Sequence, residues 1–179
     1  MKSIGSVKED LVLEKRVSIT PETVKKFNSI NISVLIEKKY AEHLGISDEE
    51  YKKNGAILCN SAKEVFQKAE IILKASCPKS SEINLIKDSS ILIGLLDPFL
   101  DKEIINQLIK KKINIFSLNL LPRITRAQSM DVLSSQANLA GYRAVIESVE
   151  KFEKAIPMMM TAAGTVTPAK ILVIGAGVA

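Results

Sequence analysis

The sequence predicts an α/β fold with a mostly parallel sheet, then a long helix, then the first strand of a second unit. Three observations support this prediction. Short β-branched runs alternate with amphipathic segments through the first two thirds of the 179 residues, which is typical of βαβ units. Apolar residues then recur at helical spacing from about Leu133 to Ile156. Finally, an apolar run over residues 170–174 leads into a glycine-rich turn.

The early part of the chain supplies the elements of the sheet. The predicted strands are Ser3 to Val7, Ile32 to Ile36, Ile71 to Ala75, Ile91 to Leu95 and Ile113 to Leu118. Thr20 can cap a helix that has Pro21 in its first turn and runs towards Asn28. Further helices are predicted at Asp48 to Lys53, Ala62 to Lys68, Ser81 to Leu85 and Lys102 to Lys111.

The pattern changes after Leu118. Residues 119–131 have no clear period and many polar side chains, which predicts a loop. The long helix that follows is ended by Pro157, and its length suits a connector between two domains. We therefore expect three parts: an N-terminal α/β domain at residues 1–125, a loop, connector helix and linker at 126–168, and the start of a second domain at 169–179.

The second domain begins with a recognisable pattern. Lys170 to Ile174 reads as a buried strand, and Gly175-Ala176-Gly177 begins a G-x-G-x-x-G/A turn. In such a turn the first glycine makes the tight bend and the second lets the backbone approach a pyrophosphate. The third position, the following helix and the acidic residue for the ribose lie beyond Ala179. We therefore expect a truncated Rossmann domain that binds a dinucleotide, after a Rossmann-like or flavodoxin-like sheet domain, in a fragment of a larger enzyme.

Composition narrows the possible classes of protein. A hydrophobic fraction of 46% with 25% charged residues is typical of a globular protein. The longest apolar stretches, such as Ile91 to Leu96, are far shorter than the roughly 18 residues that span a bilayer. The N-terminus has no apolar signal region, so a cytoplasmic location is expected. The net charge of +5 comes mostly from lysines without interleaved aromatic residues, so no nucleic-acid partner is expected. His43 lacks companions at metal-ligand spacing, so no metal is expected either.

The polar loop is the strongest candidate for a binding site. Arg123 and Arg126 offer forked hydrogen bonds, Gln128 an amide, Asp131 an acceptor, and Ser134 a hydroxyl or a cap, all near one helix N-terminus. This set suits a polar or anionic ligand. A capped helix beside two solvated arginines explains the same residues equally well.

The loop also carries a resemblance. The segment from Pro122 to Val145 resembles the RQD loop and the following helix of the alpha subunit of proton-translocating nicotinamide nucleotide transhydrogenase, and the likeness continues through Pro157 to Val166. The segment from Glu14 to Pro21 is shared more widely, with alanine dehydrogenase and its relatives. Together these motifs cover the whole fragment.

The resemblance implies roles for particular residues. Arg123, Gln128, Asp131 and Ser134 fall on the loop positions around the nicotinamide end of NAD(H), and Gln128 would also face NADP(H) of a partner subunit. Tyr142 aligns with a tyrosine that lies close to this site in the family. Simple packing on the connector helix would explain a tyrosine at this position equally well. Gly175 and Gly177 would touch the pyrophosphate. No catalytic acid or base is expected.

The resemblance further implies a function and partners. The complete enzyme would transfer hydride from NADH to NADP+, coupled to proton translocation across the inner membrane. The NAD(H) component would form a homodimer and dock on the NADP(H)-binding component, the beta subunit, at the cytoplasmic face. It would meet the membrane only through its partners. The fragment is not expected to be competent without the remainder of the alpha subunit.

Two alternatives stay open. An alanine dehydrogenase-like soluble enzyme would need an acid/base group and cations that hold a small carboxylate. Arg16 and Lys74 stand at comparable places, but residues 95–98 lack the histidine that this family carries, so alanine oxidation is disfavoured. Arg16 and Lys74 are more readily explained as structural residues that hold a carboxylate or carbonyl. The other alternative is a non-catalytic remnant of a split or truncated gene.

Overall fold

The computed structural model describes residues 2–96 and 102–179. The chain divides into two compact units, Met1–Leu121 and Pro122–Ala179. Each unit is described by itself below.

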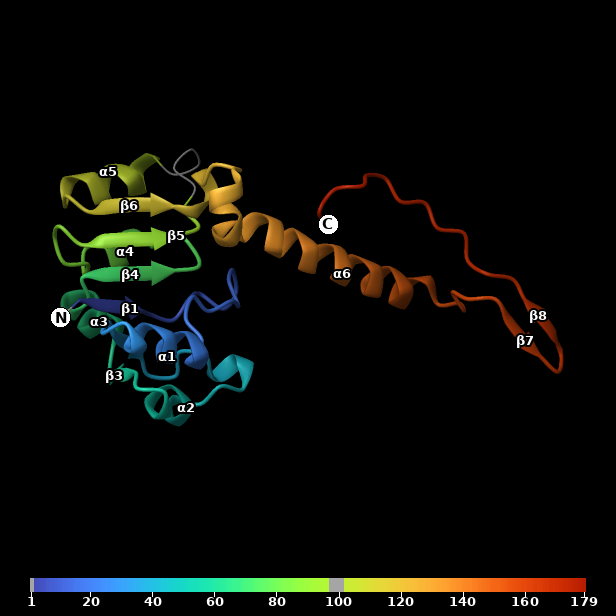
Figure 1. Cartoon of the computed structure of the whole chain (residues 1–179), viewed down its shortest axis with the longest axis horizontal. Coiled ribbons are helices and arrows are strands. Elements are labelled where there is room, and N and C mark those ends of the chain that lie inside the picture. The colour runs from blue at the N-terminus through green and yellow to red at the C-terminus, as the bar shows by residue number, and fades with distance from the viewer. Residues whose placement is uncertain (1, 97–101) are drawn as a thin grey trace. The chain divides into compact units, whose positions relative to one another are not determined.

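The first unit is built on a six-stranded sheet in which every pair of neighbouring strands is parallel (Figure 1). Its strand order is β3-β2-β1-β4-β5-β6, so the direction of winding reverses between β1 and β4. This is the doubly wound arrangement, and it confirms the predicted fold class. The strands are β1 (Ser3–Ser6), β2 (Ser33–Glu37), β3 (Ile57–Cys59), β4 (Ile71–Lys74), β5 (Ile91–Gly94) and β6 (Asn114–Ser117).

Helices connect these strands and begin where the sequence supplies caps. They are α1 (Pro21–Ser29), η1 (Glu42–Leu44), α2 (Asp48–Lys53), α3 (Ala62–Lys68), α4 (Ser80–Ile83) and α5 (Lys102–Lys110), and a short turn, η2 (Leu118–Leu120), follows β6. The Thr20 side chain accepts a hydrogen bond from the Thr23 backbone N–H at the start of α1, as the sequence predicts. Ser47 and Glu50 form a capping box on α2.

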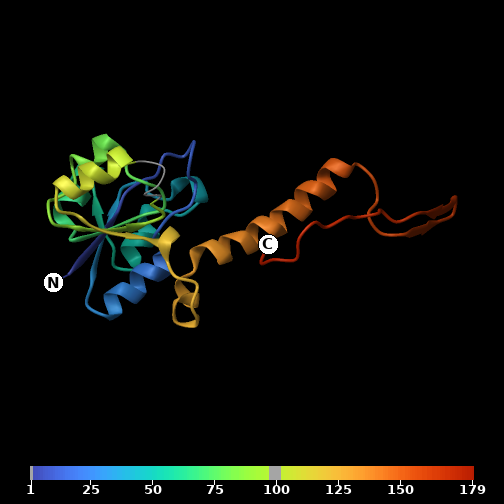
Figure 2. The same cartoon turned by 90° about the horizontal axis from the view of Figure 1, so that it is seen from above.

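Two hydrophobic clusters cover the two faces of the sheet, and Figure 2 shows helices on both sides. One cluster joins the strands to α3, α4 and α5 and includes the buried Phe66, Leu92 and Leu108. The other lies between the strands β1, β2, β3 and β4 and the helices α1 and α2. It includes Tyr40 and Tyr51, whose rings meet edge to face. Buried on both sides, the strands β1, β2 and β4 form the centre of the core.

Some short elements were not predicted from the sequence. The strand β3 has only three residues, too few for a pattern of alternation to stand out. In the second unit, β7 (Met159–Thr161) and β8 (Gly164–Val166) form an antiparallel hairpin where a linker was predicted. Its two-residue turn is Ala162-Ala163, without the Asn-Gly or Asp-Gly signal by which hairpins are recognised.

The second unit is organised around one long helix. A turn, η3 (Thr125–Met130), occupies the predicted loop and leads into α6 (Val132–Phe152), which ends four residues earlier than predicted, at a left-handed Glu153. Residues 170–174 were predicted to be a strand, but they pair with no other strand in the described part of the chain. Within residues 2–96 and 102–179, no helix combines the length and apolar character needed to cross a membrane.

Asp131 fixes the start of α6. Its carboxylate accepts hydrogen bonds from the Ser134 backbone N–H at 3.0 Å and from the Ser134 hydroxyl at 2.5 Å. The hydroxyl bond is the main reason that the pKa of Asp131 lies below its usual range. The ionised carboxylate thus satisfies one of the free N–H groups of the first helical turn.

Neighbouring residues on α5 test the burial of the core. Leu108 is fully buried, whereas Ile109 is 60% exposed. We predict that Leu108→Ala lowers the free energy of unfolding by about 2–5 kcal/mol, because it leaves a cavity in the core. The matched control, Ile109→Ala, should change it by less than about 0.5 kcal/mol. Urea unfolding followed by circular dichroism measures both, and equal effects would contradict the assigned faces of α5.

The cap of α6 predicts a pH dependence. Because the pKa of Asp131 is lower in the folded chain, the stabilisation of the helix start is present above the unfolded pKa of about 3.9 and is lost as the pH falls through the lower folded pKa. NMR titration of the Asp131 carboxyl should give a midpoint below about 3.9. Asp131→Asn keeps an acceptor and should remove this dependence, whereas Asp131→Ala should loosen the first turn at every pH. A midpoint at or above the unfolded value would contradict the cap.

Candidate functional site

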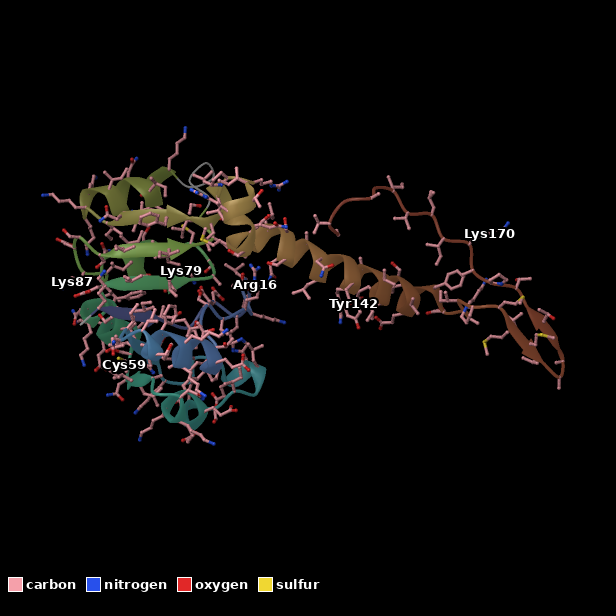
Figure 3. The ribbon with its side chains drawn as sticks, viewed as in Figure 1. Arg16, Cys59, Lys79, Lys87, Tyr142 and Lys170 are labelled. Carbon is pink, nitrogen blue, oxygen red and sulfur yellow. The ribbon has the colours of Figure 1, made fainter. Side chains whose placement is uncertain are left out.

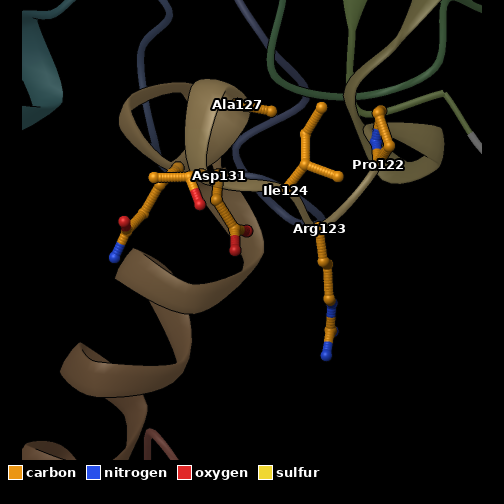
Figure 4. A pocket seen from close by; sticks show the side chains of 7 residues that line it. Pro122, Arg123, Ile124, Ala127 and Asp131 are labelled. Atoms are coloured by element: carbon orange, nitrogen blue, oxygen red, sulfur yellow. The ribbon is translucent and has the colours of Figure 1, made fainter.

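A polar pocket of about 250 Å³ lies at the η3 turn, just before α6 (Figure 4). It is lined by Pro122, Arg123, Ile124, Thr125, Ala127, Gln128 and Asp131. Three residues that the sequence predicts as site residues, Arg123, Gln128 and Asp131, therefore meet at one place.

Backbone hydrogen bonds give the pocket its shape. The N–H of Ile124 donates to the carbonyl of Pro122, and the N–H of Ala127 donates to the carbonyl of Ile124, both at 2.9 Å. Ala127 is buried and anchors the turn. Backbone hydrogen bonds and the buried Ala127 thus hold the loop, while the guanidinium of Arg123 extends away from the backbone (Figure 4).

The electrostatics of the pocket are set by one carboxylate and one guanidinium. Hydrogen bonds from Ser134 lower the pKa of Asp131, and the nearby charge of Arg123 lowers it further. Asp131 is consequently ionised at neutral pH. Among the residues that the structure describes, the lining contains no histidine, cysteine, lysine or tyrosine, so these residues offer no side chain that exchanges a proton near neutral pH.

The other predicted site residues lie outside the lining. Ser134 is not among the residues that line the pocket, but its hydroxyl donates a hydrogen bond to the Asp131 carboxylate. Tyr142 is 69% exposed on α6 and lies about 12 Å along the helix axis from Ser134 at 1.5 Å per residue (Figure 3). Gly175 has a φ of +106°, which glycine tolerates readily, and Gly177 follows it in an exposed segment.

The end of the described chain returns to α6. A Cβ atom placed on Gly141 would fall 1.7 Å from the carbonyl oxygen of Ala179, so a larger residue here would require one of the two segments to shift. The glycine-rich turn therefore ends beside the helix residue that precedes Tyr142. Neither Gly141 nor Ala179 is a predicted site residue, and neither is among the residues that line the pocket.

A second polar cluster lies in the first unit, after the carboxyl ends of β1 and β4. The buried Lys74 ammonium lies 3.2 Å from a Glu9 carboxylate oxygen and 3.0 Å from one of Glu82. Glu9 also accepts hydrogen bonds from the Ala75 N–H and the Ser76 hydroxyl. A cavity of about 540 Å³ borders this cluster. Because the strand order reverses here, doubly wound sheets commonly bind ligands at this position.

The other cations at this edge of the sheet are also paired with carboxylates. Arg16 lies 2.6 Å from Glu14, and Lys79 lies 2.7 Å from Asp10 (Figure 3 labels both cations). Arg16 and Lys74 thus hold carboxylates of their own domain, as expected from the sequence. Glu9 and Glu82 were not predicted as their neighbours. Finding Glu9 would have required the order of the strands, because it meets Lys74 only where β1 lies beside β4.

His43 makes a structural contact, and the residues that the structure describes form no metal centre. The Nε2 atom of His43 lies 2.7 Å from the carbonyl oxygen of Lys15, which gives this histidine a structural contact. No group of three or more His, Cys, Asp or Glu side chains that could hold a metal ion occurs in residues 2–96 and 102–179.

Comparison with known domain families gives two matches. The family described as "Alanine dehydrogenase/PNT, N-terminal domain" matches residues 5–140, and the corresponding C-terminal domain matches residues 144–179. The first match includes the pocket, the start of α6 and all of the described sheet except the first residues of β1.

Individual relatives agree with these matches. The chain is 42% identical over 171 residues to an NAD(P) transhydrogenase subunit alpha polypeptide of Rhodospirillum rubrum, a match that covers 93% of this chain and 44% of the relative. It is 32% identical over 178 residues to alanine dehydrogenase of Methanococcus maripaludis, covering 98% of this chain and 47% of that protein. The crystal structure of transhydrogenase from Sinorhizobium meliloti superposes with a TM-score of 0.93 at 44% identity, covering 99% of this chain and 53% of that one.

The chain spans about half the length of these relatives. Its matches include the N-terminal domain and only the start of the C-terminal, NAD-binding one. With its fold, its two domain matches and its likeness to transhydrogenase alpha subunits, the chain belongs to the alanine dehydrogenase/PNT family.

Proposed function

We propose that this chain is the N-terminal part of the NAD(H)-binding component of a transhydrogenase, in which hydride passes from NADH to NADP+ and proton translocation is coupled to the transfer. The observation that carries the proposal is the pocket of residues 122–131, which gathers Arg123, Gln128 and Asp131 and whose described lining contains no group that exchanges protons near neutral pH.

The chemistry of the pocket suits this reaction. When bound, NAD(H) supplies the hydride, and passage of hydride between two nicotinamide rings requires neither an acid nor a base. What the protein must do is hold the reacting atoms at an attack distance of about 3 to 3.5 Å. A small loop of fixed hydrogen-bonding groups fulfils that role, and an ionised Asp131 would not compete by donating a proton.

The size of the pocket suits one end of the cofactor. Sites for whole drug-sized ligands enclose about 300–1,000 Å³, whereas this pocket has about 250 Å³. We propose that it takes the nicotinamide end, with Arg123 and Gln128 as donors and with Ser134 holding Asp131 in place. Gly175 and Gly177 would approach the pyrophosphate, and Tyr142 would lie near the bound cofactor.

The partners follow from the same assignment. Gln128 would face the NADP(H) bound by the beta subunit, and the complete NAD(H) component would be a homodimer. Contact with the membrane would occur only through partner subunits at the cytoplasmic face, and they would carry out proton translocation. The remainder of the alpha subunit must be present before the cofactor site is complete.

The pairing of cations weighs against the alternative of alanine oxidation. A small carboxylate substrate at the edge of the sheet would have to displace Glu9 or Glu82 from Lys74 and Glu14 from Arg16. The sequence at residues 95–98 also has no histidine to serve as an acid or base. A non-catalytic remnant would keep the pocket but would bind no NADH even when the second domain is supplied.

Two neighbouring arginines test the cofactor contact. In the chain joined to the rest of an alpha subunit, we predict that Arg123→Ala raises the Kd for NADH about tenfold, since a hydrogen bond from a charged group contributes about 1.5–3 kcal/mol. Arg126 does not line the pocket, so Arg126→Ala should leave the Kd within about twofold. Calorimetry measures both constants. Equal effects of the two substitutions would place the nicotinamide end elsewhere.

Gln128 tests hydride transfer itself. We predict that Gln128→Ala, in the enzyme assembled with its NADP(H)-binding partner, lowers turnover about 10- to 100-fold, because small displacements of the reacting atoms cost up to about 10²-fold. Ser135→Ala is the control, since within the described residues its hydroxyl donates to the backbone carbonyls of Asp131 and Val132 at the start of α6. Unchanged turnover and unchanged complex formation in Gln128→Ala would refute the assignment.

A further inference from the structure

Ile124 is an apolar residue in the middle of the polar loop. It lines the pocket together with its neighbours Arg123 and Thr125, and it is 55% exposed. Single exposed apolar residues are common and need no explanation by themselves. Ile124 differs because it forms part of a cavity whose lining also carries a guanidinium, an amide and a carboxylate. The pocket therefore has an apolar part as well as a polar one.

The backbone holds Ile124 in one place. Its N–H donates a hydrogen bond to the carbonyl of Pro122, and its carbonyl accepts one from the N–H of Ala127, both at 2.9 Å. These two bonds use both polar groups of the Ile124 backbone. The β-branched side chain is restricted at χ1, so little freedom remains. Ile124 is therefore a fixed surface, which loses little entropy when a ligand covers it.

Pro122, Ile124 and Ala127 together make the apolar part of the lining. Figure 4 shows the Ile124 side chain on the side of Pro122 and Ala127, while the Arg123 guanidinium points the other way. The lining is thus divided between carbon atoms and hydrogen-bonding groups. A flat heterocycle that carries an amide group matches this division, since the ring can rest on carbon while the amide forms hydrogen bonds.

The charges of the pocket offset each other. The Arg123 guanidinium acts on the Asp131 carboxylate from nearby, and this carboxylate already accepts two hydrogen bonds from Ser134. The apolar part of the lining therefore decides how a charged ring compares with a neutral one. A charge placed against Ile124 would lose contact with water without gaining a partner, which costs free energy.

We infer that Ile124 is the residue on which the nicotinamide ring rests, and that it makes the site select the neutral ring of NADH over the positively charged ring of NAD+. This inference rests on the proposed function, which assigns the nicotinamide end to the pocket of residues 122–131. The polar residues of the loop hold the amide, and Ile124 sets the choice between the two redox states. The same contact favours release of the cofactor once it has given up its hydride.

Three ligands measured by calorimetry test the inference: NADH, NAD+ and ADP-ribose, which lacks the nicotinamide ring. In the chain joined to the rest of an alpha subunit, Ile124→Asn should raise the Kd for NADH about tenfold, because the ring no longer covers an apolar side chain. The Kd for NAD+ should rise less than about threefold, because a charged ring gains little from that surface. The Kd for ADP-ribose should stay within about twofold.

Two further variants separate a ring contact from a change in the fold. Ile124→Val keeps a β-branched apolar side chain and should leave all three constants within about threefold. Ile109→Asn makes the same substitution as Ile124→Asn at an isoleucine that is 60% exposed on α5, and it should leave them unchanged. Circular dichroism of each variant verifies the fold, which an exposed position should preserve.

The outcomes also separate this inference from the proposed function. An unchanged ratio of the Kd values for NADH and NAD+ in Ile124→Asn would overturn the inference. An equal loss of NADH and ADP-ribose binding would overturn it too, because it would show a structural role. Both results leave the proposed function in place if Arg123→Ala still weakens NADH. NADH binding that neither Arg123→Ala nor Ile124→Asn affects would contradict both.

Discussion

A parallel strand with apolar side chains on both faces requires layers on both sides and neighbours on both edges, and this requirement governs both units of the chain. In the first unit, β2 meets it fully, with β1 and β3 on its edges, Leu35 in one hydrophobic cluster, and Val34 and Ile36 in the other. In the second unit, residues 171–174 are also apolar, but they pair with no strand in the part of the chain that the structure describes. The first unit therefore encloses its sheet between two hydrophobic clusters, whereas residues 171–174 of the second unit are exposed.

The pocket and the start of α6 depend on the same side chain. Asp131 caps α6 through Ser134 and also lines the pocket, so the start of the helix and the candidate site share one side chain. This double role keeps the carboxylate ionised and fixed. In the proposed function this pocket positions a ligand without exchanging a proton, which would separate it chemically from the ion pairs of Lys74 at the edge of the sheet.

Periodicity was sufficient to predict the alternating fold, and Thr20 was correctly recognised as a helix cap. Periodicity failed to predict β3, which is too short to show a pattern. It also failed for the hairpin after residue 158, whose turn lacks the usual Asn-Gly or Asp-Gly pair. The loop residues were predicted from their chemistry and from a resemblance, and the structure brings Arg123, Gln128 and Asp131 into one pocket. The contact between Lys74 and Glu9 depends on β1 lying beside β4, which a local pattern does not encode.

The central claim is that residues 122–131 hold the nicotinamide end of NAD(H). A crystal structure of the chain joined to the rest of an alpha subunit, with NADH bound, tests it most directly. The proposed function predicts the nicotinamide ring against Gln128 and Asp131, with the pyrophosphate at Gly175 and Gly177. A nicotinamide ring in the cavity beside Lys74, at the edge of the sheet, would contradict the claim and favour a dehydrogenase that acts on a small carboxylate.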